Sequence, residues 1–248
     1  MVLYFNTRLI KSHLLTIFLG AYHYHQPLMK SAVLLPAQKR FAVGKILCLG
    51  QNYAKHAKEM GSSSPASPII FLKPSTAIIE NGESIVLPKM SNDVQHEVEL
   101  TILLGARGKN IPQSKAFDCV AGYGVGLDMT MRDRQKEAKA EGNPWSVAKG
   151  FDTSAALSPF VPKESVENPN DLEIRLSVNG KERQHSNTSN MIYKIDFIIA
   201  FLSTIFTLEE GDVIYTGTPE GVGKVVDGDL IEAEIPGVGK LQHAVISG

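Results

Sequence analysis

The stretch VQHEVELTILLG at residues 94–105 alternates between apolar and polar side chains, and this period of two predicts a β-strand. Val98 and Leu100 fall on one side of such a strand, whereas Glu97 and Glu99 are neighbours on the other side. Two carboxylates at neighbouring positions of one face repel each other unless water, a cation or a basic group lies between them. The strand therefore has either a solvent-exposed face, which is common in antiparallel sheets, or a charged partner for its two acids.

Strand patterns recur along most of the chain, separated by glycine-rich turns. They are KILCLG, IIFLKP, SIVLP, VAGYGVGLDMT, LEIRLSVNGKERQ and the short segments of the tail GDVIYTGTPEGVGKVVDGDLIEAEIPGVGKLQHAV. In LEIRLSVNGKERQ, Asn179-Gly180 is expected to form a hairpin turn. No internal repeat appears, so one main domain is expected, and its class is predicted to be β-rich α+β.

Three segments interrupt the strands with helical patterns. NYAKHAKEMG at 52–61 predicts a short helix with Asn52 as its N-cap and Gly61 as its stop. MRDRQKEAKAEG at 131–142 is polar nearly all round and is expected to be an exposed element. The third helix is expected at 190–206 and packs one apolar face against the sheet, comprising Ile195, Ile198, Ile199, Leu202, Ile205 and Phe206.

The composition excludes several classes of partner. With 43% hydrophobic residues, 21% charged residues and a formal net charge of −1, the 248 residues resemble a soluble globular protein and supply no basic surface for nucleic acid. We predict a small-molecule partner, with no nucleic acid and no membrane. The two cysteines, Cys48 and Cys119, lie in apolar segments, which favours buried thiols in a reducing compartment and predicts a cytoplasmic protein.

The first segment has a composition of its own, because no Asp or Glu precedes Glu59. An even spread of the acids would place about six there. Such a leader could be a mitochondrial transit peptide, a weak signal peptide or an appended segment, since MKSAVLLPAQKRFAVGK from Met29 resembles the start of a domain. We therefore divide the chain into an N-terminal extension and lead-in at 1–44 and one catalytic domain at 45–248, with mitochondria as the alternative location.

Asp128 ends the strand-like segment GVGLDMT, which follows the strand with Glu97 and Glu99. Three carboxylates with open positions for water or substrate oxygens suit Mg²⁺ or Mn²⁺ better than Zn²⁺, which prefers nitrogen and sulfur ligands. Sequence spacing does not by itself bring Asp128 to the two glutamates.

Six motifs in order resemble the series typical of the fumarylacetoacetate hydrolase family, most closely its short acylpyruvase-like branch. They are LGQNYAKHAKEMG, HEVEL, GYGVGLDMTMRD, NPWSVAKGFDT, LSVNGKERQ and VIYTGTPEGVG, and the resemblance runs from Lys45 to the C-terminus. Six motifs in one order are far more specific than any one of them. The resemblance implies the mixed β-sandwich roll of the family's C-terminal domain, usually as a homodimer.

The resemblance also implies roles for particular residues. Glu97, Glu99 and Asp128 would hold Mg²⁺ or Mn²⁺, which binds the carboxylate and 2-oxo group of a 2-oxo acid and acts as a Lewis acid. Lys149 would neutralise developing negative charge, although the sequence alone also allows a salt bridge to Asp152.

His56 and Glu59 match the family's lid helix, on which the glutamate orients the imidazole and the histidine takes a proton from water. From the sequence alone, such a pair three residues apart would carry no role. Arg132 and Gln135 correspond to substrate contacts, and Thr218 lies where a hydroxyl meets the substrate.

The chain departs from the acylpyruvase pattern at Gln51, where relatives often carry an arginine, so one fixed cation for substrate carboxylates is missing. The expected reaction is metal-dependent hydrolysis of the C–C bond of an acylpyruvate, such as acetylpyruvate or fumarylpyruvate, to pyruvate and a carboxylic acid. The alternatives are an oxaloacetate decarboxylase, an isomerase or decarboxylase of 2-hydroxyhepta-2,4-diene-1,7-dioate, and, more remotely, a non-enzymatic binding protein on the same fold.

Overall fold

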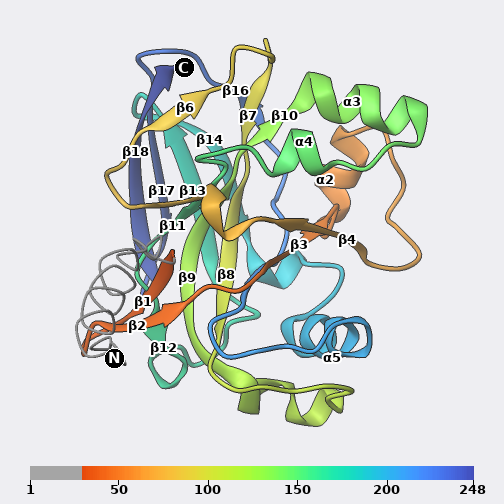
Figure 1. The fold of residues 1–248 in the computed structure, drawn as a ribbon, viewed down its shortest axis with the longest axis vertical. Helices are drawn as coiled ribbons and strands as arrows, with labels where there is room; N and C mark the ends of the chain where they lie inside the picture. The colour runs from red at the N-terminus through yellow and green to blue at the C-terminus, as the bar shows by residue number, and fades with distance from the viewer. Residues whose placement is uncertain (1–29) are drawn as a thin grey trace, which may run out of the picture.

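The computed structural model describes residues 30–248, and the elements are labelled in Figure 1. The leader predicted at 1–28 lies outside this part of the chain. None of the helices between residues 30 and 248 is long and apolar enough to cross a membrane.

The largest sheet has eight strands and curls through the middle of the molecule (Figure 1). Its order is β4 (Ile69–Lys73), β3 (Ile46–Gly50), β15 (Val213–Tyr215), β8 (Val98–Leu104), β9 (Val120–Asp128), β11 (Ala155–Leu157) and β5 (Ile78–Glu80), with β12 (Val161–Pro162) also paired to β9. The pairs β15–β3 and β11–β5 are parallel and the others are antiparallel, so the sheet is mixed.

A second sheet packs against the first through contacts of β9 with its strands β17 and β18. Its order is β14 (Lys181–Asn187), β13 (Glu173–Val178), β17 (Leu230–Ile235), β18 (Gly239–Ser247) and β6 (Ile85–Leu87). Apolar side chains of both sheets, such as Leu100, Val125, Ile231 and Val245, are completely buried in one core. The predicted β-rich α+β class with a mixed β-roll is confirmed.

Two small sheets complete the strands: β10 (Thr130–Met131), β7 (Val94–His96) and β16 (Gly223–Lys224) in one, and β1 (Ser31–Leu34) and β2 (Lys39–Ala42) in the other. The β1–β2 hairpin contacts the body of the fold, since the Phe160 N–H donates to the Val33 carbonyl at 2.7 Å. The domain boundary at residue 45 remains a prediction.

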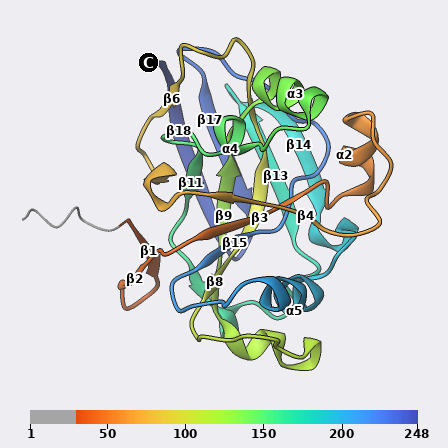
Figure 2. The same ribbon diagram turned by 45° about the vertical axis from the view of Figure 1, so that its right-hand side comes forward.

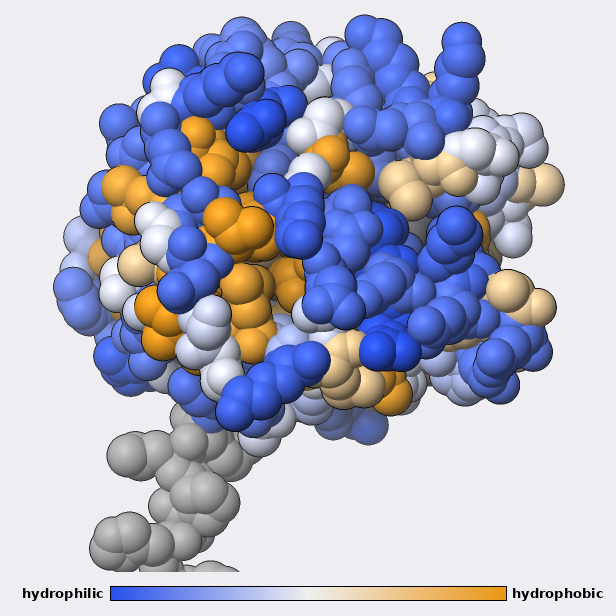
Figure 3. Space-filling view, turned by 90° about the horizontal axis from the view of Figure 1, so that it is seen from above, coloured by the Kyte–Doolittle hydropathy of each residue, from blue (hydrophilic) through white to orange (hydrophobic). Residues whose placement is uncertain are grey.

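Short α-helices and 3₁₀ turns connect the strands of the described residues. They are α2 (Ala54–Glu59), α3 (Arg132–Glu141), α4 (Ser146–Lys149) and α5 (Ile195–Ile205), with the 3₁₀ turns η1 (Ser75–Ala77), η2 (Gln113–Cys119), η3 (Lys163–Ser165) and η4 (Thr188–Asn190). Figures 1 and 2 show α2, α3 and α4 together at one end, with α5 at the other. The surface on the α3 side, on the right of Figure 3, is mainly hydrophilic, as expected for this polar helix.

The single strand predicted at 94–105 is interrupted at Glu97, where β7 ends and β8 begins in a different sheet. The interpretation of a solvent-exposed face is wrong, because every residue of β8 is buried. One face packs in the main core, and the other carries Glu99 at the site and Leu103 in a second hydrophobic cluster, so Glu99 is 1% exposed.

Two helix boundaries also differ from the prediction. Asn52 is not the N-cap of α2, because its amide is used elsewhere: it donates to the Thr216 carbonyl at 2.8 Å and accepts from the Tyr193 N–H at 2.8 Å. The third helix begins at Ile195 and not at residue 190, since η4 forms a separate turn, and its last residue, Ile205, is 50% exposed at the helix end instead of packing in the core. The stop at Gly61 is consistent with its φ of 71°.

Candidate active site

Strand pairing brings the three acids together. β8 and β9 run antiparallel with Val98 opposite Leu127, and the next step of the ladder is the Asp128 N–H donating to the Glu97 carbonyl at 2.9 Å. Glu97, Glu99 and Asp128 are all buried, and each offers a carboxylate oxygen within 4.8 Å of the others. An all-oxygen donor set of this size could hold a hard divalent cation such as Mg²⁺ or Mn²⁺.

Two lysines neutralise part of this charge. Lys149, at the end of α4, places Nζ 2.8 Å from Glu97 Oε2, 2.6 Å from Asp128 Oδ2 and 2.7 Å from Thr130 Oγ1. It forms these contacts and not the alternative salt bridge to Asp152. Lys73, from β4, lies 2.8 Å from the other oxygen of Asp128 and is 1% exposed.

Sequence reasoning missed Lys73. The only signal was a lysine closing the apolar segment IIFLKP, where a buried charge requires a partner.

The three carboxylates differ in their electrostatic surroundings. Burial raises the pKa of Glu97, but the charges of Lys149 and Arg132 outweigh this effect and hold the pKa well below its usual value. Burial also raises the pKa of Glu99, and the negative charges of Asp128 and Glu97 raise it further. Glu99 is thus the member of the cluster that most lacks a cation.

The backbone supplies one contact to Glu99. Its Oε2 accepts the N–H of Gly217 at 2.6 Å. Gly217 has a φ of 96°, a left-handed conformation that favours glycine, and a Cβ there would lie 2.6 Å from Asn52 Cβ. The turn in TGTPEG is therefore shaped to bring this amide to the acid cluster.

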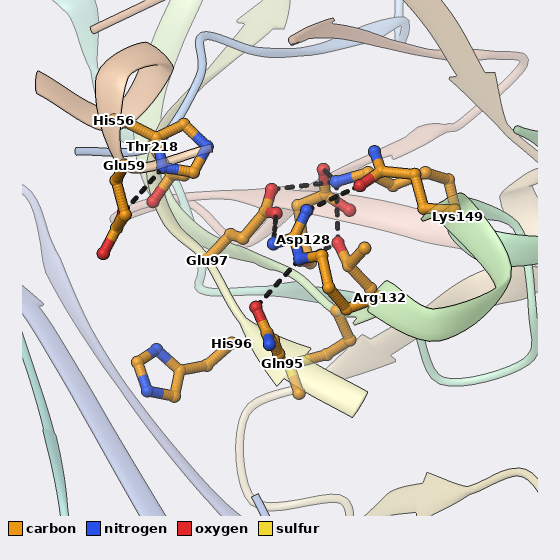
Figure 4. Close-up of polar contacts among 12 residues, drawn as sticks. His56, Glu59, Gln95, His96, Glu97, Asp128, Arg132, Lys149 and Thr218 are labelled. Atoms are coloured by element: carbon orange, nitrogen blue, oxygen red, sulfur yellow. Dashed lines mark hydrogen bonds and ion pairs between the residues drawn. The ribbon is translucent and has the colours of Figure 1, made fainter. Parts of the chain in front are cut away.

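His56 and Glu59 lie on the opposite side of Glu97 from Lys149 (Figure 4). His56 Nδ1 is 3.1 Å from Glu59 Oε2, and Glu59 Oε1 accepts the Gly221 N–H at 3.0 Å. His56 is 4% exposed, so this pair is not the ordinary surface pair that its spacing alone would suggest. The Gly221 N–H thus holds the Glu59 carboxylate in place, and that carboxylate orients the His56 imidazole.

Arg132 begins α3 and reaches back to the cluster. Its Nη2 contacts Glu97 Oε1 and its Nε donates to Gln95 Oε1 at 2.8 Å (Figure 4). Its Nη1 donates to Gln135 Oε1 at 2.6 Å. Gln135, the buried residue of this helix, thus positions Arg132.

Thr218 is buried at the same site, but its hydroxyl is engaged by the protein. It donates to the Val98 carbonyl at 2.8 Å and accepts from Gln184 Nε2 at 2.8 Å. Gln184 also donates to the Pro219 carbonyl at 2.9 Å, and its Oε1 lies 3.1 Å from the Val98 N–H and 3.0 Å from His96 Nδ1. Sequence reasoning missed Gln184, whose side-chain amide connects His96 and Val98, the neighbours of Glu97, to Thr218 and Pro219 in the TGTPEG turn.

A small pocket joins these groups. Six of the residues predicted for the site line it: His56, Glu97, Arg132, Gln135, Lys149 and Thr218. Glu99 and Asp128 lie behind Glu97 in the carboxylate cluster, and Glu59 supports His56. Gln51 also lines the pocket, with its Nε2 donating to Ser62 Oγ at 3.1 Å, so no guanidinium occupies this position.

A buried carboxylate cluster that can hold a divalent ion, opening to a pocket on a mixed β-roll, defines a metal-dependent enzyme. The chain belongs to the fumarylacetoacetate hydrolase family: residues 45–246 match the model described as the C-terminal domain of fumarylacetoacetate hydrolase. The resemblance seen in the sequence is confirmed.

Relatives and solved structures extend over nearly the whole domain. An uncharacterised protein of Pyrococcus horikoshii is 54% identical over 203 residues, covering 82% of this chain and 88% of its own. The mitochondrial oxaloacetate tautomerase FAHD1 of Mus musculus is 49% identical over 211 residues, covering 85% and 96%. The crystal structure of fumarylpyruvate hydrolase from Pseudomonas aeruginosa, in complex with Mn²⁺ and pyruvate, superposes with a TM-score of 0.87 at 35% identity, covering 91% of this chain and 100% of that one.

Proposed function

We propose that this protein is a metal-dependent hydrolase that cleaves the C–C bond of acylpyruvates, giving pyruvate and a carboxylic acid. The observation that carries the proposal is the placement of the His56–Glu59 pair and Lys149 on opposite sides of Glu97 at one pocket. Hydrolysis requires a base for water on one side of the substrate and a cation for the enolate on the other.

In this proposal, Glu97, Glu99 and Asp128 hold Mg²⁺ or Mn²⁺. The solved fumarylpyruvate hydrolase with Mn²⁺ and pyruvate supports both the kind of ion and a 2-oxo acid as ligand. The bound ion supplies Lewis acidity toward the 2-oxo acid.

The chain's own residues perform the proton transfers. His56, oriented by Glu59, takes a proton from water as the oxygen adds to the 4-carbonyl carbon. The C3–C4 bond then breaks, and the acyl carbon C4 leaves as the carboxylic acid. The electron pair of the broken bond stays on C3 and forms the enolate of pyruvate. Lys149 stabilises that negative charge, and the proton that His56 took from water passes to C3, which completes pyruvate. Arg132 and Gln135 bind the substrate from α3. The Thr218 hydroxyl already bonds to Gln184 and to the Val98 carbonyl, so Thr218 contacts the substrate only as part of the pocket wall.

A second candidate, acting on oxaloacetate, is favoured by the names of relatives. The FAHD1 proteins of Mus musculus and Arabidopsis thaliana, at 49% and 48% identity, are named oxaloacetate tautomerases. Tautomerisation moves a proton between C3 and the 2-oxygen and requires no water, so the same acid cluster and Lys149 would serve it. Decarboxylation or isomerisation of related acids would also pass through an enolate.

The decisive experiment compares these reactions in one preparation with saturating Mn²⁺. We expect acetylpyruvate or fumarylpyruvate hydrolysis to exceed oxaloacetate tautomerisation and decarboxylation in kcat/KM, to vanish in EDTA and to return with Mn²⁺. His56→Ala should lower hydrolysis by about 10²- to 10⁴-fold while Mn²⁺ affinity stays near wild type.

The matched control is Lys58→Ala on the exposed side of α2, which should keep full activity. Hydrolysis at the parental rate in His56→Ala would refute the role of the pair. Wild-type protein that converts oxaloacetate without hydrolysing either acylpyruvate would establish the second candidate instead.

For the remaining assignments, we propose a homodimer in the cytoplasm, with mitochondria as the alternative because the FAHD1 relatives are named mitochondrial. The buried free thiols Cys48 and Cys119 support a reducing compartment. Sedimentation equilibrium tests whether the protein is a homodimer, and imaging of the tagged full-length chain tests its location in the cell.

A further inference from the structure

One face of α3 presents three polar side chains to the pocket. Arg132, Gln135 and Lys139 are spaced three and four residues apart, so they lie along one side of the helix, and all three line the pocket. Two turns separate Arg132 from Lys139, a rise of about 10 Å along the helix axis. The row therefore leads from the acid cluster outward.

Lys139 differs from the other cations of the pocket in its lack of a direct carboxylate partner among the described residues. Arg132 contacts Glu97, and Lys149 contacts Glu97 and Asp128. Within residues 30–248, Lys139 forms no ion pair, and the two glutamates nearest to it in the helix, Glu137 and Glu141, bond to Arg134 and Asn143.

Trp145 holds the free ammonium in place. Lys139 Nζ lies over the indole ring, 5.0 Å from its centroid, and Trp145 itself lines the pocket. Burial lowers the pKa of Lys139, and the positive charges of Arg132 and Lys149 lower it further. An anion beside Lys139 would stabilise the charged ammonium and so offset both the burial and the repulsion from Arg132 and Lys149.

We propose that Lys139 binds a second carboxylate at the far end of the substrate, so that the enzyme prefers dicarboxylic 2-oxo acids to monocarboxylic ones. The inference rests on the proposed function, in which the 2-oxo acid end lies at Glu97, Glu99 and Asp128. A substrate chain of several carbons that begins there and follows α3 brings its other end to Lys139. Gln51, where relatives often carry an arginine, lines the same pocket and supplies no charge.

The test uses Mn²⁺-loaded full-length protein and two ligands of equal chain length, 2-oxoheptanedioate and 2-oxoheptanoate, which differ only in the distal carboxylate. Their binding is measured by calorimetry, without turnover. We expect wild type to prefer the diacid, and Lys139→Met to weaken diacid binding about tenfold with little change for the monoacid. Methionine keeps an unbranched chain against Trp145, and Lys139→Arg should restore the preference.

Lys136→Met is the matched control, since it removes the same charge from an exposed position of α3 that does not line the pocket and should leave both affinities unchanged. In kinetics, Lys139→Met should raise KM for fumarylpyruvate about tenfold and leave acetylpyruvate unaffected. Wild-type protein without a preference for the diacid, or a Lys139→Met variant that changes both ligands equally or neither, overturns the inference. Because the calorimetry requires no reaction, the proposed hydrolysis could fail while the carboxylate preference is still measured.

Discussion

Replacing Glu99 by glutamine should stabilise the metal-free protein while weakening its metal binding. Glu99 is buried beside two like charges, and its one hydrogen-bond donor, the Gly217 N–H, can bond equally well to the amide oxygen of glutamine. The substitution therefore removes the negative charge, or the need for Glu99 to take up a proton to lose that charge, without removing an acceptor. Its two carboxylate neighbours, Glu97 and Asp128, retain their own contacts to Lys149.

The size of the effect follows from the separation of the acids. Their nearest oxygens lie within 4.8 Å of one another. Two unit charges at that distance repel by about 3.5 kcal/mol at an effective dielectric constant of about 20. Glu99 takes part in two such pairs, but Lys149 and the Gly217 amide offset much of that repulsion. We expect the free energy of unfolding of the metal-free protein to rise by about 1–3 kcal/mol.

Urea denaturation in EDTA and in Mn²⁺ measures both effects. Wild type should gain about 4.1 kcal/mol at an Mn²⁺ concentration of about 1,000 times its Kd, whereas Glu99→Gln should gain much less. The order of stability is then reversed between the two conditions. Glu167→Gln, an exposed position outside the site, should match wild type in both. A Glu99→Gln protein that is less stable than wild type in EDTA would refute the electrostatic reasoning.

Three further outcomes are expected. Gln184→Leu leaves the Val98 N–H and its other polar partners unsatisfied, so unfolding free energy should fall by about 3–5 kcal/mol; a loss under about 1 kcal/mol in urea would contradict this. Burial lowers the pKa of His243, so the unfolded chain binds more protons and stability should fall as pH drops below about 6.5. His243→Gln should flatten that pH dependence, and an unchanged slope of urea midpoints between pH 7.5 and 5.5 speaks against it. Deleting residues 1–28 should leave a soluble, active enzyme, and aggregation would show the segment to be part of the fold.

Local patterns in the sequence determined the elements and the residue types of the site. Alternation placed Glu97 and Glu99 on the same side, and Asn179-Gly180 forms the expected turn, with positive φ at both residues. The ordered motifs added Asp128, Lys149 and the five other site residues (His56, Glu59, Arg132, Gln135 and Thr218) by resemblance. The alternation and the turn could be predicted because side-chain period and turn conformation depend on residues close together in the chain.

Only the tertiary structure decided how those residues are joined. The register of β8 on β9 brings Asp128 to Glu97, and the edge strand β4 delivers Lys73 from far away in sequence. Gln184 crosses from the second sheet to hold the strand break beside Glu97. A buried charge or amide requires a partner, but the sequence does not show which one, because that depends on packing between segments separated by tens of residues.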